Sequence, residues 1–189
     1  FHGTTYFRPG TYGYQQHMWY AALDGEASIF VTHPGSTSEE GDMRPGYWHG
    51  NGVMPALKQQ HGLLGGIYVI PDEHPIGYTH LYCPECRFDE VIHEENWIFL
   101  RKETGYLALW CSEKMEAHNG MNFNCEQRAY SKNAAYLCVC GGQKSDASFA
   151  AFKKRAKETL PSYDKESKTL TAQNFELSYV ACKDVTQFL

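Results

Sequence analysis

The chain has 189 residues, a net charge of −5, and 42% hydrophobic and 14% aromatic residues. This length suits one domain with a buried core, and the composition excludes an intrinsically disordered chain. No basic run is dense enough to follow a phosphate backbone, and no apolar run approaches the about 20 residues of a membrane-spanning helix. We therefore expect neither nucleic acid nor a membrane as a partner.

The N-terminus and the cysteines bear on the origin of the chain. Phe1-His2-Gly3-Thr4-Thr5 has neither an initiator methionine nor the features of a signal peptide. We expect residues 1–189 to form a single antiparallel β-sandwich domain that is a fragment of a larger chain. The cysteine count, seven, is odd, so these residues cannot all pair within the chain. Unpaired buried thiols fit a reducing compartment such as the cytoplasm, or an envelope protein, better than a disulfide scaffold.

The first predicted element is a β-hairpin. Residues 14–23 and 26–33 form two strand-like runs joined by Asp24-Gly25. Asp-Gly is favoured in two-residue hairpin loops because both residues there need a positive φ. Residues 33–55 then read as a loop, and so long a loop inside a compact domain is often functional.

Further strands are predicted by short apolar runs bounded by turn residues. Residues 96–101 and 106–111 flank a turn, and each run is apolar on both faces. Strands of this kind lie centrally between two layers. The other predicted strands cover residues 62–70, 78–82 and 134–140.

One late segment, residues 146–158, predicts an α-helix that Ser145 or Asp146 can cap. A final hairpin pairs residues 166–172 with residues 175–182. Antiparallel strands with short turns and one late helix favour a mainly β fold, an antiparallel, supersandwich-like β-sandwich. The apolar stripe of the helix comprises Phe149, Phe152, Ala156 and Leu160.

Aromatic, histidine and asparagine residues gather mainly in the N-terminal half. His17 and Trp19 fall on one face of the first predicted strand, and Tyr78 and His80 on one face of a later strand. A polysaccharide lyase needs a Tyr or His base, an Asn or Arg that stabilises the charge of a uronate carboxylate, and aromatic platforms for sugar rings. Alternatively, these residues fill the end of the sandwich. The set comprises Tyr14, His17, Trp19, Arg44, Tyr47, Trp48, His49, Asn51, Tyr78 and His80.

Cys83-Pro84-Glu85-Cys86 is a second candidate site, because a CxxC pair is half of a zinc site. No second CxxC exists, and Cys138-Val139-Cys140 has the wrong spacing for a zinc knuckle. We therefore expect no cofactor, with a structural zinc ion at Cys83 and Cys86 as the alternative to two ordinary thiols in a turn. The acidic residues predict a solvated sheet edge, with acid–base catalysis by paired carboxylates as the alternative. They are Asp89, Glu90, Glu94 and Glu95.

Several segments, in this order, are together similar to those of a known group of proteins. They are Tyr12-Gly13-Tyr14-Gln15-Gln16-His17-Met18-Trp19, Phe30-Val31-Thr32-His33-Pro34-Gly35, Arg44-Pro45-Gly46-Tyr47-Trp48-His49-Gly50-Asn51-Gly52, Tyr78-Thr79-His80-Leu81-Tyr82, Phe88-Asp89-Glu90 and Gly105-Tyr106-Leu107-Ala108-Leu109-Trp110. With them the chain resembles the β-sandwich part of large bacterial proteins of the heparinase II/III group and related polysaccharide lyases, in which an (α/α) toroid precedes the sandwich. The resemblance covers most of the chain, although the Cys83–Cys86 turn stands where an aromatic-Pro turn is usual.

The resemblance implies that the chain forms one wall of a substrate cleft, facing an N-terminal toroid domain of the same protein. It implies a uronate-containing polysaccharide as partner, β-elimination as the reaction, and a secreted or envelope location in bacteria. The chain has no run of amphipathic helices that could form the toroid, so we do not expect it to be a complete enzyme. A non-catalytic carbohydrate-binding or interdomain structural module is the alternative. The implied catalytic residues are His17, His49, Asn51, Tyr78 and His80, and the implied substrate-binding residues are Tyr14, Trp19, Arg44, Tyr47 and Trp48.

Overall fold

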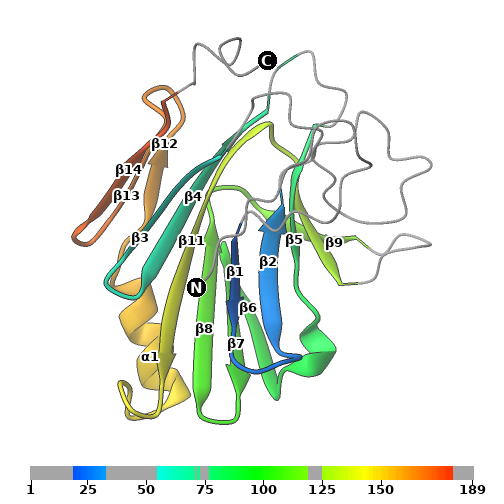
Figure 1. Cartoon of the computed structure of the whole chain (residues 1–189), viewed down its shortest axis with the longest axis vertical. Coiled ribbons are helices and arrows are strands. Elements are labelled where there is room, and N and C mark those ends of the chain that lie inside the picture. The colour runs from blue at the N-terminus through cyan, green and yellow to red at the C-terminus, as the bar shows by residue number, and fades with distance from the viewer. Residues whose placement is uncertain (1–18, 33–54, 71, 73–76, 119–124, 181–189) are drawn as a thin grey trace, which may run out of the picture.

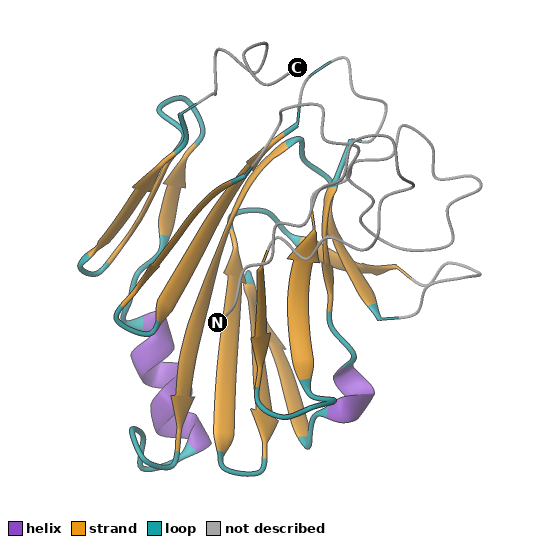
Figure 2. Cartoon of the chain, in the orientation of Figure 1, coloured by secondary structure: helices purple, strands orange, loops and turns teal. Residues whose placement is uncertain are grey.

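The computed structural model describes residues 19–32, 55–70, 72, 77–118 and 125–180, with the backbone alone at residues 30–32. Within this part of the chain there are three antiparallel sheets and one α-helix (Figure 1, Figure 2). The predicted mainly β, antiparallel, sandwich-like fold with a late helix is therefore confirmed. None of the helices among these residues is both long and apolar enough to cross a membrane.

The two larger sheets form the sandwich, and the smallest sheet lies outside it (Figure 1). The five-stranded sheet has the order β1 (Trp19–Ala22), β2 (Ser28–Thr32), β5 (Thr79–Tyr82), β10 (Glu126–Ala129) and β9 (Met115–His118). The six-stranded sheet has the order β3 (Ala56–Gln60), β4 (Leu63–Val69), β11 (Asn133–Gly142), β8 (Gly105–Cys111), β7 (Trp97–Lys102) and β6 (Glu90–Glu94). The small sheet consists of β12 (Ser162–Asp164), β13 (Thr169–Ala172) and β14 (Phe175–Ser178).

The core between the two larger sheets is made of alternate side chains from each strand. Trp19 and Ile29 enter it from the five-stranded sheet, and Tyr136 enters it from the six-stranded sheet. The hydroxyl oxygens of Thr79 and Tyr136 lie 2.7 Å apart, so a hydrogen bond joins the two sheets within the core. This bond satisfies polar groups whose burial without a partner would be costly.

The six-stranded sheet is apolar on both faces. On β7, Ile98 faces the core between the sheets, whereas its neighbour Phe99 faces a second apolar cluster on the opposite side. The helix α1 (Phe149–Lys157) and the small sheet cover that opposite side, where Phe152 and Phe175 pack against it. The prediction that residues 96–101 and 106–111 lie between two layers is therefore confirmed.

The helix begins later than predicted. Ser148 is its N-cap, and the Ser148 hydroxyl oxygen accepts a hydrogen bond from the backbone N–H of Ala151 at 3.1 Å. The predicted caps, Ser145 and Asp146, are wrong, because both lie in the turn before the helix and their side chains bond to each other at 2.7 Å.

The apolar stripe of the helix is shorter than predicted. Phe149, Phe152 and Ala156 are buried, as the helical spacing requires. Leu160 is 77% exposed, because the helix ends at Lys157 and Leu160 adopts a left-handed φ of 47° that turns the chain away.

The loop of the first hairpin also differs from the prediction. Ala22 pairs with Ser28, so the loop has five residues, and neither Asp24 nor Gly25 has a positive φ. Instead, Asp24 Oδ1 accepts hydrogen bonds from the backbone N–H groups of residues 26 and 27, at 2.7 and 2.6 Å. The side chain of Asp24 thus shapes the turn, in the manner of an Asx turn.

Five strands were not predicted from the sequence: β3, β6, β9, β10 and β12. Each has three to five residues, and each contains several polar or charged residues. The predicted final hairpin exists but is shorter, since β13 begins at Thr169 and β14 ends at Ser178.

Candidate functional site

The structure describes three of the ten predicted site residues. Tyr78 lies just before β5, His80 lies on β5, and Trp19 lies on β1. Trp19 is 0% exposed in the core between the sheets, so its ring packs the sandwich and does not present a surface to a sugar. Tyr14, His17, Arg44, Tyr47, Trp48, His49 and Asn51 lie outside the described residues.

The register of β5 and β10 explains how the site is assembled. His80 lies directly opposite Arg128, and Tyr82 lies opposite Glu126. Because Leu81 points into the core, its neighbours His80 and Tyr82 point to the other face of the five-stranded sheet. Glu126 and Arg128 occupy the same face, which is turned away from the core.

A carboxylate joins the two basic side chains of this face. Glu126 Oε1 lies 2.7 Å from His80 Nδ1 and 3.0 Å from Arg128 Nε, and Arg128 Nη2 donates to Glu126 Oε2 at 3.2 Å. His80 is 5% exposed and Glu126 is 4% exposed. Ionised groups buried to this degree need such partners, because their desolvation is otherwise costly.

The protonation of Glu126 decides which nitrogen of His80 can act as a base. Burial alone would raise the pKa of Glu126, but hydrogen bonds from His80 and Arg128 outweigh it and hold the pKa below its ordinary value. An ionised carboxylate only accepts hydrogen bonds, so Nδ1 of His80 must carry a proton and donate it. In the neutral imidazole, Nε2 is then the nitrogen that can take up a proton.

Two tyrosines flank this charged group. The guanidinium carbon of Arg128 lies 4.0 Å from the centroid of the Tyr78 ring, a close cation–π contact. The ring of Tyr78 meets those of His80 and Tyr130 edge to face, with centroids 5.9 and 6.2 Å apart. Tyr130 is 60% exposed, so an aromatic surface borders the buried charges. We call Tyr78, His80, Glu126 and Arg128 the outer-face cluster.

Half of the outer-face cluster could be predicted from the sequence. Tyr78 and His80 were predicted as site residues on one face, and the structure brings their rings together. Glu126 and Arg128 were missed, because the four-residue strand β10 was not predicted. The signal available was the charge alternation in Glu126-Gln127-Arg128-Ala129, which places both charges on one face of any strand there.

Cys83 and Cys86, the alternative zinc half-site, belong to no metal-ligand group among the described residues. Cys83 is buried at the end of β5, whereas Cys86 is exposed on the short 3₁₀ helix η1 (Glu85–Arg87). No group of three or more His, Cys, Asp or Glu side chains within the described ranges is arranged to hold a metal ion.

Three of the four predicted acidic residues, Asp89, Glu90 and Glu94, form ion pairs at a sheet edge. β6, which runs from Glu90 to Glu94, is an edge strand of the six-stranded sheet. Glu90 pairs with Arg101, and Glu94 binds both Lys153 and Lys157 of α1. These carboxylates therefore hold elements together and are not arranged as a catalytic pair.

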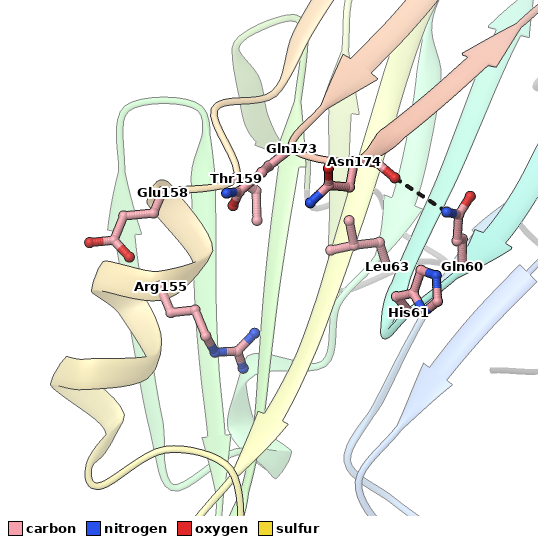
Figure 3. Close-up of a pocket in the computed structure, with 8 residues that line it drawn as sticks. All are labelled: Gln60, His61, Leu63, Arg155, Glu158, Thr159, Gln173 and Asn174. Atoms are coloured by element: carbon pink, nitrogen blue, oxygen red, sulfur yellow. Dashed lines mark hydrogen bonds between the residues drawn. The ribbon is translucent and has the colours of Figure 1, made fainter.

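A polar cavity lies on the other side of the six-stranded sheet (Figure 3). It measures about 280 Å³ and lies between the end of α1 and the β3–β4 and β13–β14 turns. Gln60 Nε2 donates to the Asn174 carbonyl there at 3.3 Å, and Arg155 is held by Asp146. The described residues that line this cavity include no Phe, Tyr or Trp, so they offer no large aromatic platform for a sugar ring.

No protein-family model, no curated protein and no solved structure matches this chain.

Proposed function

We propose that the chain is the β-sandwich domain of a polysaccharide-lyase-like protein, and that the outer-face cluster belongs to one wall of a cleft for a uronate-containing polysaccharide. The observation that carries this proposal is the contact of an imidazole, a carboxylate, a guanidinium and a phenol on one face of the five-stranded sheet. The partner wall would be an N-terminal toroid domain of the same protein.

Three groups of the outer-face cluster have a role in the proposed reaction. β-Elimination removes the proton next to the uronate carboxylate, and we assign this step to His80 Nε2, because Glu126 occupies Nδ1. Arg128 supplies the guanidinium of the cluster, and guanidinium groups bind carboxylates well, so we assign the uronate carboxylate to it. Glu126 acts as a positioning residue, because it orients the ring of His80.

A non-catalytic carbohydrate-binding module is the second candidate. It is favoured by Tyr130, whose ring is 60% exposed beside Tyr78. An exposed aromatic ring offers a flat apolar face and a hydroxyl to a sugar, and binding of this kind needs no proton transfer.

Titration calorimetry of the whole 189-residue chain with pectic, alginate and glycosaminoglycan oligosaccharides tests the binding that both candidates require. We expect Tyr130→Ala to weaken binding about tenfold, equivalent to about 1.4 kcal/mol for a lost stacking contact. Tyr179→Ala is the matched control, because Tyr179 lies in the apolar cluster on the opposite side of the six-stranded sheet and should leave affinity unchanged. Absence of heat with every glycan would contradict both candidates.

Formation of the unsaturated product, followed by ultraviolet absorbance, separates the two candidates. The assay uses the protein expressed from its full gene. A lyase should form product, and His80→Asn should lower kcat about a hundredfold or more while leaving KM nearly unchanged, because a general base acts in the transition state. Binding without product indicates the module, and full activity in His80→Asn would contradict a role for His80 as the base.

A further inference from the structure

A row of directly opposed residues crosses all five strands of the five-stranded sheet. In the register of this sheet, Tyr20 on β1 lies opposite Phe30 on β2, and Phe30 lies opposite Tyr82 on β5. Tyr82 lies opposite Glu126 on β10, and Glu126 lies opposite His118 on β9. The row therefore runs from one edge of the sheet to the other and passes through the outer-face cluster at Glu126.

Alternation along the strands places the side chains of Tyr20, Tyr82 and His118 on the outer face. Both neighbours of Tyr20 and both neighbours of Tyr82 belong to the core between the sheets, so the two tyrosines point to the opposite face. On β9, Met115 packs against the core, so His118, three residues later, points outward. All three side chains are half-buried, so part of each is accessible to solvent.

The length and the chemistry of the row suit an extended carbohydrate. Neighbouring strands lie about 4.8 Å apart, so the two ends of the row, separated by four strand intervals, are about 19 Å apart. A tyrosine ring offers a flat apolar face with a hydroxyl at its tip, and a neutral imidazole both donates and accepts a hydrogen bond. A sugar ring likewise has an apolar face and a rim of hydroxyl groups.

We propose that the polysaccharide lies along this row, across the strands, and that Tyr20, Tyr82 and His118 bind it, an assignment that rests on the proposed function. The sugar unit at the outer-face cluster contacts Tyr82 and His118, which flank Glu126 in the register. Tyr20 lies three strand intervals from Glu126, about 14 Å, so only a longer oligosaccharide reaches it.

The alternative path runs along the strands, past Tyr130. Tyr130 directly follows β10, and its ring meets that of Tyr78. Along β10, both of these tyrosines lie on the same side of Glu126, whereas the row offers partly exposed side chains on both sides of it. The path across the strands is favoured for that reason, and Tyr20 and Tyr130 report separately on the two directions.

Titration calorimetry of the 189-residue chain with oligosaccharides of increasing length tests the row. The ligands are the disaccharide, tetrasaccharide and hexasaccharide of the pectic, alginate and glycosaminoglycan series. We expect affinity to rise with length. Tyr20→Ala should weaken hexasaccharide binding about tenfold, because a stacking contact is lost, and should change disaccharide affinity by less than about twofold. Tyr82→Ala should weaken binding at every length.

Three variants are the controls. Tyr130→Ala should weaken binding of all three lengths by the same factor, because Tyr130 borders the outer-face cluster itself. Tyr20→Phe keeps the ring and should recover most of the hexasaccharide affinity that Tyr20→Ala loses. Tyr20→Thr repeats the test with a residue that strands favour, and circular dichroism verifies the fold of each variant.

The outcomes separate the row from the proposed function. An equal effect of the Tyr20 substitutions on disaccharide and hexasaccharide, or no effect on either, would overturn the row alone. A length dependence that Tyr130→Ala removes and Tyr20→Ala keeps would also overturn it, in favour of the path along the strands. Absence of heat with every glycan would contradict the proposed function and the row together.

Discussion

Asp146 is buried just before α1, and two nitrogens of Arg155 donate hydrogen bonds to its carboxylate. Arg155 Nε donates to Oδ1 at 2.7 Å and Nη2 donates to Oδ2 at 2.9 Å, a bidentate pair. These hydrogen bonds are the main reason that the pKa of Asp146 falls to about 2, and a bond from Ser145 contributes as well. The ion pair between Asp146 and Arg155 therefore connects the turn after β11 to the helix α1.

The pKa of Asp146 predicts how the stability of the protein depends on pH. The folded-state pKa is lower than the ordinary value of 3.8, so the stabilisation is complete above pH 3.8 and is lost as the pH falls toward about 2. Asp146→Asn should therefore lower the free energy of unfolding by about 1–2 kcal/mol near neutral pH, a figure that allows for the partial exposure of Arg155. Denaturant unfolding at a series of pH values measures the difference, which should shrink in acid.

Glu158→Gln is the control for this prediction. Glu158 pairs with Lys154 at 3.9 Å on the exposed side of α1, and exposed pairs contribute little. We expect this variant to change stability by less than about 0.5 kcal/mol at any pH. An Asp146→Asn effect of the same size at neutral and acid pH would contradict the assigned role of the charge.

The helix α1 shows how an element is joined to the rest of the fold. Phe152 is 0% exposed, and its ring lies 5.4 Å from the ring of Tyr106 on β8. Lys153 and Lys157 both bind Glu94 on the edge strand β6. Apolar packing and charge therefore attach the helix to the same sheet, at different strands.

Two substitutions compare a buried and an exposed residue of the apolar stripe that was predicted for α1. Phe152→Ala should lower the free energy of unfolding by about 3–5 kcal/mol, because it leaves a cavity between α1 and the six-stranded sheet. Leu160→Ala should change it by less than about 0.5 kcal/mol, since Leu160 is 77% exposed. Thermal and denaturant unfolding measure both variants, and similar losses in the two would mean that the helix is packed differently.

The strands that could be predicted from the sequence are those whose side chains are mostly buried. The strands β7, β8 and β11 consist mainly of buried residues, and their apolar runs stand out in the sequence. The strands β6, β9 and β10 are short and rich in charge, and their hydrogen-bonding partners, not their own composition, hold them in a sheet. Half of the outer-face cluster lies on one of these, so that half could not be located from local patterns.

The described residues of the molecule form three layers: the five-stranded sheet, the six-stranded sheet in the middle, and α1 with the small sheet (Figure 1). The contact with the third layer is tight at Gly65 on β4. A Cβ atom built at Gly65 would lie 2.6 Å from Phe175 and 3.0 Å from Leu170, both in the small sheet. The absence of a side chain at this position is what allows β13 and β14 to approach the middle sheet.

This contact predicts a coupling between layers. Gly65→Ala should destabilise the protein by about 1–3 kcal/mol through overpacking, and adding Phe175→Leu should recover part of that loss. Gly25→Ala is the matched control, because a Cβ there meets no atom within 4 Å and the residue has no positive φ. A double-mutant cycle on the free energy of unfolding measures the coupling, and strict additivity of the two changes would contradict the contact.

The sequence by itself determined the fold class and the layering, because alternation and two-faced apolar runs report directly on which side chains are buried. It also identified Tyr78 and His80 as neighbours on one face, since that follows from spacing within one strand. Only the tertiary structure decided that Glu126 and Arg128 join them and that Trp19 belongs to the core. The reason is physical: pairing between strands 46 residues apart depends on register and on the summed burial of the whole sandwich, which no local pattern contains.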